Sequence, residues 1–144
     1  SQTYGPNFTS ALVGGALGAS KEKPGLDARQ PFDSLEELEK TFPLFITESH
    51  LRQNSAGKGK KSGGHGWTLS IRVLEDCQLS LIADRGVNRP YGLYGGVAGS
   101  LNEVFVARPG QKPKSIPLKS IVQLSALDVV TFHSAGGGGW GKSS

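Results

Sequence analysis

Residues Gly57-Lys58-Gly59-Lys60-Lys61-Ser62-Gly63-Gly64-His65-Gly66 open the stretch that decides the fold, and Arg89-Pro90-Tyr91-Gly92-Leu93-Tyr94-Gly95-Gly96 close it. Between these glycine-rich segments, apolar and polar residues alternate in two runs, 67–73 and 77–83. Alternation with a period of two is typical of half-buried strands. Glu75 and Asp76 separate the runs. The stretch therefore predicts a β-hairpin between two glycine loops.

The glycine content supports a fold with unusual backbone geometry. Glycine occupies 21 of the 144 positions, against an average share of about 7%. Because glycine loses more conformational freedom on folding than any other residue, this many glycines indicate positions that the backbone itself requires. We expect long loops, left-handed turns and close approaches between chain segments. The chain length suits one domain.

Further strands are predicted at 44–52, 103–108, 114–118, 120–125 and 128–133. One short helix is predicted over 33–42, because Ser34 and Glu37 form a capping box and Pro43 ends the pattern. The expected fold class is mainly β, with barrel- or sandwich-like antiparallel sheets, one short helix and long Gly-rich extended loops. We expect an extended N-terminal segment over 1–32 and a β-rich domain over 33–144.

Charge and cysteine content narrow the class of protein. The net charge of +4 and the pI near 9.3 permit an anionic partner without demanding nucleic acid, which we do not expect as a partner. No apolar run reaches a membrane span and no signal peptide is visible. The single Cys77 excludes an internal disulfide and a cysteine-based zinc site. We expect a cytoplasmic protein that has no membrane partner. Since Met is absent, either the initiator was removed or this is a piece of a longer chain.

Lys58, Lys60 and Lys61 are candidate anion-binding residues. Successive amides and lysines in a glycine-rich loop can attract phosphate or carboxylate. The alternative, which we favour, is a solvated basic loop. His65 lies between glycines in the same segment and is the most plausible functional histidine.

Arg85, Arg89 and Tyr91 are candidate substrate-binding residues together with His65. Arginine gives bidentate contacts to an anionic group, and both arginines precede or enter the second glycine loop. An internal salt bridge that holds this loop is an equal alternative. No G-x-S-x-G elbow is present, so no catalytic residue is assigned.

Metal and thiol chemistry are not expected of this chain. His50, His65 and His133 are its only histidines, and a metal site would need them to converge, for example with Glu48 or Asp84. Their spacing matches no metal-binding pattern, so no metal ligand is assigned. Cys77 falls on the apolar face of its run, which favours a core residue over a nucleophile.

The glycine-rich tail matches the residue pattern of a nucleotide-binding loop, but we do not expect it to have that structure. Residues 136–143 fit the pattern G-x-x-x-x-G-K-[ST]. That loop works at the start of a helix, where amides and the helix dipole converge on phosphate. The sequence stops one residue later, so we expect no such helix. We expect an extended chain anchored by Trp140.

The order of motifs resembles the hydantoinase B/oxoprolinase family, specifically its carboxy-terminal part. The family's glutamate-rich segment before an aromatic-proline pair and its Arg-Phe-Leu-Glu-Asp have counterparts here, as do its two glycine loops and its closing Gly-Gly-Gly-Gly-Tyr-Gly. In this sequence the glutamate-rich segment with its aromatic-proline pair is 35–43, and the counterpart of Arg-Phe-Leu-Glu-Asp is 72–76. The two glycine loops are 54–66 and 90–99, and the closing glycine segment is 136–141. The match covers about residues 30–141. Asn54 and Ser62 stand where the family has aspartate and arginine.

The resemblance implies a subunit or C-terminal domain of an ATP-dependent system. Members of the family include 5-oxoprolinases, N-methylhydantoinase B subunits and subunits of acetone and acetophenone carboxylases. The chain would scaffold a multisubunit cyclic-amide hydrolase or ketone carboxylase, could line its active site, and would not be catalytic alone. The implied partners are a larger ATP-binding, hydantoinase A-like subunit and hydantoinase B-like subunits. The resemblance implies that ATP and a divalent metal bind those partners and that this chain holds no cofactor.

Two rival functions remain open. The chain could be a non-catalytic assembly subunit that never contacts substrate, or a free-standing anion-binding module that uses the 57–66 loop. Mutation of the site residues separates the first rival from an active-site role. Turnover should fall while the complex stays intact only if these residues line the active site. Saturable, salt-sensitive phosphate binding by the isolated chain is the mark of the second.

Overall fold

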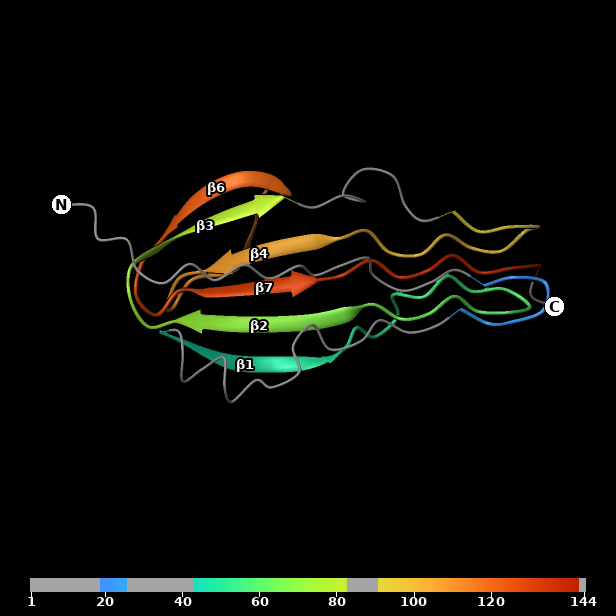
Figure 1. The fold of residues 1–144 in the computed structure, drawn as a ribbon, viewed down its shortest axis with the longest axis horizontal. Helices are drawn as coiled ribbons and strands as arrows, with labels where there is room; N and C mark the ends of the chain where they lie inside the picture. The colour runs from blue at the N-terminus through green and yellow to red at the C-terminus, as the bar shows by residue number, and fades with distance from the viewer. Residues whose placement is uncertain (1–18, 26–42, 83–90, 143–144) are drawn as a thin grey trace.

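The computed structural model describes residues 19–25, 43–82 and 91–142 (Figure 1). In this part the chain is mainly β, as the sequence predicts, and contains strands but no helix. The helix predicted over 33–42 lies outside the described residues, as does most of the N-terminal segment. Within the described part no helix is long and apolar enough to cross a membrane.

The strands fall where alternation predicts them. They are β1 (Leu44–Leu51), β2 (Trp67–Val73), β3 (Cys77–Ile82), β4 (Glu103–Ala107), β5 (Lys114–Ser115), β6 (Lys119–Leu124) and β7 (Val129–His133). Only β5 is much shorter than its predicted range of 114–118. Pro113 and Pro117 flank it, and proline has no amide hydrogen to donate to a neighbouring strand.

Two antiparallel sheets make up the fold. The larger has the order β1-β2-β7-β4-β5 and the smaller consists of β3 and β6. The central strand β2 pairs Ile71 with Ile46 on one side and with Val130 on the other. Figure 1 shows β3 and β6 lying beyond β4, on the side away from β1.

The predicted hairpin of β2 with β3 is wrong. β2 pairs with β1 and β7, whereas β3 pairs with β6 in the other sheet. Residues 74–76 therefore form a corner between two layers rather than a hairpin turn. The corner is tied to the next one, because the Ala126 amide donates to the Asp76 carboxylate at 2.8 Å. Both runs alternate equally well, and alternation alone does not tell which strand is the partner.

The two sheets bury one apolar layer between them. Val73, Val104, Leu124 and Val130 form a buried cluster, against which residues of both sheets pack, including Cys77, Leu79, Leu81, Val106 and Val122. Cys77 is thus a core residue, as predicted. Burial raises the pKa of its thiol, and the charges of Asp128 and Asp76 raise it further, which disfavours a thiolate nucleophile.

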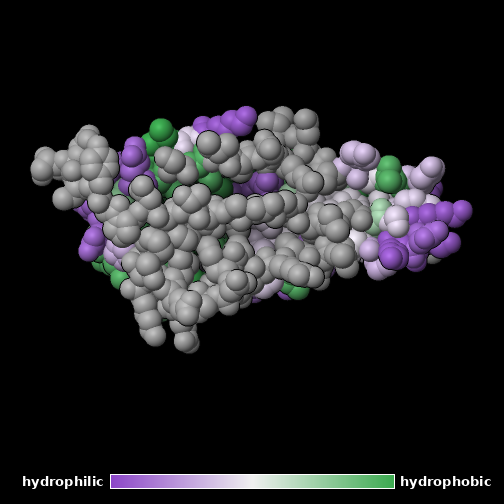
Figure 2. Space-filling view, viewed as in Figure 1, coloured by the Kyte–Doolittle hydropathy of each residue, from purple (hydrophilic) through white to green (hydrophobic). Residues whose placement is uncertain are grey.

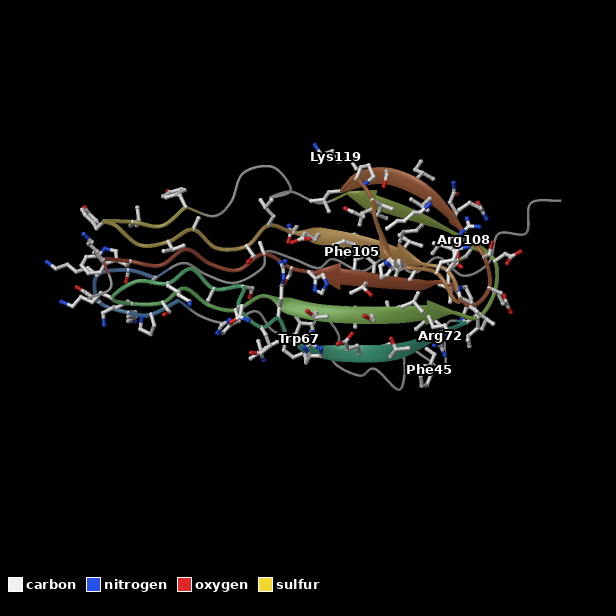
Figure 3. All side chains as sticks on the ribbon, turned by 180° about the vertical axis from the view of Figure 1, so that it is seen from behind. Phe45, Trp67, Arg72, Phe105, Arg108 and Lys119 are labelled. Atoms are coloured by element: carbon white, nitrogen blue, oxygen red, sulfur yellow. The ribbon has the colours of Figure 1, made fainter. Side chains whose placement is uncertain are left out.

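A second cluster lies at the β1 side of the larger sheet. Leu44, Leu69 and Ile71 are buried there, with Trp67 and Phe132 packed against them. The Trp67 indole donates to the Ser49 hydroxyl at 2.9 Å, which satisfies its polar atom. Trp67 stands at the end of β2 from which the glycine-rich segments extend, and Arg72 stands near the opposite end (Figure 3).

Candidate functional site

The glycine-rich segments leave the larger sheet together and run side by side (Figure 1). We call residues 54–66, 91–101 and 134–142, with 19–25 laid against them, the glycine bundle. Its core is the tail 134–142, whose backbone bonds to all the other segments. Ala19 donates to Gly138, Gly57 to Gly137, and Leu93 to Gly139, at 2.8, 2.8 and 2.9 Å.

The hydrogen bonds of the tail repeat every third residue. Gly136 and Gly139 donate to Ser100 and Val97, at 3.2 and 2.9 Å. Gly137 and Trp140 donate to Gly64 and Lys61, at 2.9 and 2.8 Å. In a β-ladder a strand turns to the same neighbour at every second residue, so a step of three indicates chains with threefold, polyproline II-like geometry. The bundle is therefore neither a sheet nor a set of loose loops.

Glycine is required at many of the positions where these chains touch. A Cβ added to Gly136 would lie 1.8 Å from the Ser55 carbonyl oxygen, and one on Gly138 would lie 2.0 Å from that of Tyr91. A Cβ on Gly63 would lie 2.0 Å from the Gly137 carbonyl oxygen. The same crowding fixes glycine at the axis of collagen. The close chain approaches predicted from composition are confirmed, and they account for much of the glycine content.

The distal end of the bundle gathers several predicted site residues. Lys58, Lys60 and Lys61 lie on one side of the tail, and Lys61 forms a bridge with Trp140. On the other side, Leu93 to Gly96 form a tight turn in which the Gly96 amide donates to the Leu93 carbonyl at 3.0 Å. Positive φ at Tyr94 (48°) and Gly95 (86°) is that of a type I′ turn. The Tyr94 ring packs on Trp140 with centroids 5.7 Å apart, so Trp140 anchors the tail as predicted.

Several amides of this end already donate to carbonyls of the protein itself. Gly57, Lys60 and Lys61 donate their amides to carbonyls of the tail at 2.8, 3.1 and 2.9 Å. An anion at the 57–66 segment would therefore meet lysine ammonium groups rather than these amides. The tail amides of Gly136, Gly137 and Gly139 to Gly141 likewise donate to carbonyls. They do not form the phosphate cradle of a nucleotide-binding loop.

The other predicted site residues do not all join this end. Tyr91 is exposed, and its carbonyl faces Gly138. His65 is half-buried between two buried glycines, and Gly66 packs on Ser134, so His65 lies nearer the sheet than Tyr91 does. Arg85 and Arg89 lie outside the described residues. The predicted set is thus divided between two levels of the bundle.

The junction between bundle and sheet is held by Arg52. Its guanidinium donates to the Leu101 carbonyl at 2.6 Å, to the Ser134 carbonyl at 3.0 Å and to the Glu103 carboxylate at 2.7 Å. One side chain thereby fixes the start of β4 and the start of the tail. Arg52 was not predicted as a site residue, because nothing in the local sequence pattern distinguishes it from an exposed arginine.

The buried Ser55 hydroxyl ties the first bundle segment to the same junction. It accepts the Gly66 amide at 2.8 Å and donates to the Arg52 carbonyl at 2.7 Å. Nearby, the Ala135 amide donates to the Asn102 side chain at 2.6 Å. These bonds explain why small polar residues flank the glycines at this end.

One face of the larger sheet is polar near this junction. His50, Thr68, His133 and Glu103 occupy one row across β1, β2, β7 and β4, and Glu48, Ser70, Thr131 and Phe105 occupy the next. The Glu48 carboxylate contacts the His50 ring at 2.6 Å and accepts from Ser70 at 3.2 Å, and Ser70 lies 2.9 Å from Thr131. The strand alternation contained this signal, since these polar residues are the ones that alternate with the core positions.

The two histidines of this face have opposite electrostatic environments. The hydrogen bond to the Glu48 carboxylate raises the pKa of His50, and the same bond is the main cause that lowers the pKa of Glu48. Burial lowers the pKa of His133, and the Arg52 charge lowers it further. His50 and His133 share a row, yet within the described residues no three His, Cys, Asp or Glu side chains are grouped closely enough to hold a metal ion.

Titration should separate these histidines. We expect the His50 imidazole to titrate above the ordinary value of about 6.5 and that of His133 below it. The His50 contribution to stability is then complete below about pH 6.5 and is lost as pH rises through its raised pKa. The His133 contribution is complete above about pH 6.5 and is lost as pH falls through its lowered pKa. NMR titration of the ring Hε1 signals measures both.

The matched control for this titration is Glu48→Gln. It removes the carboxylate that raises the pKa of His50, so the His50 value should fall toward the ordinary one. The His133 value should stay low, because burial is its largest cause. Equal pKa values for the two histidines in the unaltered chain would contradict the described geometry.

Comparison of sequences adds what the geometry alone does not give. The chain matches the hydantoinase B/oxoprolinase family over residues 2–143. It is 40% identical over 110 residues to an uncharacterized protein of Methanocaldococcus jannaschii, covering 75% of this chain and 19% of that protein. It is 34% identical over 112 residues to the 5-oxoprolinase PfmaA of Pestalotiopsis fici, covering 74% of this chain and 9% of that protein.

Two solved structures share the fold. An ATP-dependent caprolactamase from Pseudomonas jessenii superposes with a TM-score of 0.76 and 21% identity, over 89% of this chain and 24% of that chain. A nucleotide-free acetone carboxylase gives a TM-score of 0.73 and 18% identity, over 88% of this chain and 22% of that chain. The chain thus spans a quarter or less of the proteins named here. The family match over nearly the whole sequence confirms the resemblance seen in its motifs, and the chain belongs to the hydantoinase B/oxoprolinase family.

Proposed function

We propose that this chain serves as a C-terminal domain or small subunit of an ATP-dependent enzyme that hydrolyses cyclic amides. The observation that carries the proposal is the family match over residues 2–143. The 34% identity to a 5-oxoprolinase supports it. A caprolactam ring is also a cyclic amide, and the caprolactamase shares the fold.

The role proposed for the chain is mainly structural. Its described residues form a sandwich with a glycine bundle fixed to one end, and the bundle's contacts leave its backbone little freedom to move. Such a rigid element suits scaffolding, and its glycine segments could line an active site formed with other domains. ATP and a divalent metal would bind to those other parts, a larger hydantoinase A-like subunit and hydantoinase B-like subunits, in a cytoplasmic complex.

A second candidate function is ATP-dependent ketone carboxylation. The fold shared with acetone carboxylase favours it, at a TM-score close to that of the caprolactamase. The two functions differ in substrate and in the need for bicarbonate, so one assay separates them. A free-standing anion-binding module is a further alternative, and saturable phosphate binding by the isolated chain would support it.

The test is the native mass and composition of the complex purified from the source cell through a tag on this chain. We expect a large ATP-binding companion. ATP turnover by that complex is then compared with 5-oxoproline, hydantoins, and acetone with bicarbonate as substrates. A chain that migrates alone at 15.2 kDa would contradict the subunit proposal.

The role of the predicted site residues is tested in the same complex. His65→Ala and Arg85→Ala should lower turnover without dissolving the complex if the glycine segments line the active site. Unchanged turnover with an intact complex would favour a purely assembling role.

A further inference from the structure

The charged side chains of the glycine bundle are almost all lysines. Among the described residues of the bundle, Glu22 has the one carboxylate. The lysines of the bundle are Lys21, Lys23, Lys58, Lys60, Lys61 and Lys142. The remaining described carboxylates belong to the sandwich or its corners. Figure 2 shows hydrophilic surface gathered at this end of the molecule. Among the described residues, the distal end therefore carries an excess of positive charge that Glu22 alone does not balance.

Apolar side chains are exposed among these lysines. They are Tyr91, Tyr94, Val97 and Leu93, exposed at 77%, 80%, 55% and 42%. All four come from one segment, 91–97, which includes the type I′ turn at the end of the bundle. Exposed apolar residues rimmed by charged ones are typical of protein-binding surfaces.

The surface is also fixed before any partner arrives. The Lys142 Cβ lies close to Gly95, and the Lys60 Cβ lies close to Gly141. Both lysines therefore pack where the tail meets its neighbouring segments. Val97 donates to the Lys58 carbonyl at 2.7 Å, which joins the two sides again. A preorganised surface loses little conformational entropy on binding.

We propose that this end of the glycine bundle, Lys58, Lys60 and Lys142 with Tyr91, Leu93, Tyr94 and Val97, docks onto an acidic protein surface that has an apolar recess. The inference rests on the proposed function, and the partner is the ATP-binding companion of the same complex. Lysine ammonium groups give charge complementarity and steer association. The aliphatic side chains of Leu93 and Val97 favour a protein over a nucleic acid, because the apolar core of a protein interface can bury them, whereas a nucleic acid would engage mainly the lysines and the tyrosine rings.

Charge reversal tests the electrostatic half of the proposal. The triple variant Lys58→Glu, Lys60→Glu and Lys142→Glu should weaken retention of the ATP-binding companion by about tenfold or more. The matched control carries the same change in charge at the sandwich, as Lys112→Glu, Lys114→Glu and Lys119→Glu, all at exposed lysines. Both are prepared as the full chain in its complex, and retention is measured against salt concentration. Only the binding of the unaltered chain and of the control should fall steeply with salt.

Removal of rings tests the apolar half without altering charge. Tyr94→Asn takes away the exposed ring, and asparagine tolerates the positive φ of this position, so the turn is kept. Combined with Tyr91→Ser, it should weaken retention by about tenfold. Circular dichroism and the melting temperature verify that each variant folds.

The outcomes are distinguishable. Loss of the companion in both bundle variants and not in the control supports the proposal. Retention of the companion by folded bundle variants overturns it and leaves the proposed function intact. Absence of any ATP-binding companion from the unaltered chain overturns the proposed function, and this inference with it. Loss of the companion on nuclease treatment shows that nucleic acid occupies the surface, which also overturns a protein contact.

Discussion

Replacement of Gly138 by alanine is expected to unfold the glycine bundle. The new Cβ would lie 2.0 Å from the Tyr91 carbonyl oxygen and 2.6 Å from its carbon, and both are backbone atoms that no rotamer change can move. Overpacking of this kind in a close-packed interior costs about 3 kcal/mol or more. Urea denaturation measures the loss, and hydrogen exchange should show that amides of 91–101 lose protection first.

Gly110→Asn is the control for this prediction. Gly110 has a positive φ of 73°, but a Cβ there meets no atom within 4 Å, and asparagine tolerates the conformation. Its stability should change by about 0.5 kcal/mol or less. A Gly138→Ala protein as stable as this control would show that the tail does not pack as described.

Arg52→Ala is expected to separate the bundle from the sheet. The change removes three hydrogen bonds and leaves the carbonyls of Leu101 and Ser134 without this donor. Loss of a charged donor from a half-buried site costs about 3 kcal/mol. The pKa of His133 should also rise, because the Arg52 charge is one of the causes that lower it. Urea denaturation and NMR titration measure the two effects separately.

Arg72→Ala provides the matched control. Arg72 is exposed near the far end of β2, so its loss should cost about 0.5 kcal/mol or less. Arg52→Lys should recover only part of the stability, since an ammonium group does not reproduce the planar fork of guanidinium. Equal stability of Arg52→Ala and Arg72→Ala would contradict the role of the junction.

Strand positions were predictable because the alternation of apolar and polar residues that marks a half-buried strand lies within the strand's own sequence. The runs 67–73 and 77–83 alternate so regularly that β2 and β3 begin as predicted. Their partners were not predictable, because each strand pairs with residues far from it in the sequence, as Cys77 does with Leu124. Glu75 and Asp76 at the corner are polar residues of the kind that a hairpin turn also contains.

The glycine bundle was half predictable. Composition indicated close chain approaches, and the tail was expected to be extended. That three glycine segments pack on one another was not predicted, although glycines three apart, as at 63 and 66, 96 and 99, and 136 and 139, carry the period. A threefold period is easily missed when the search is made for periods of 2 and 3.6.

The candidate site was predicted in part for a related reason. Lys58, Lys60 and Lys61 stand out in sequence because glycines surround them, and they do gather at one end of the bundle. Arg52, Lys142 and the polar rows of the sheet join their neighbours only through tertiary pairing. Of the residues named for a metal site, Glu48, His50 and His133 share a face of the sheet, whereas His65 lies in the glycine bundle. The described residues contain no metal-binding group of three such side chains.

The step of three in the bundle imposes a rule on insertions and deletions. One residue added to a chain with three residues per turn rotates everything beyond it by about 120°. At single glycines such as Gly57 and Gly99, a residue with a side chain would then face the neighbouring backbone. The bonds from Gly136 and Gly139 to Ser100 and Val97 would also lose register. Only a change of three residues restores the phase. The bundle segments can therefore vary in length only in whole turns, although they look like loops in the sequence.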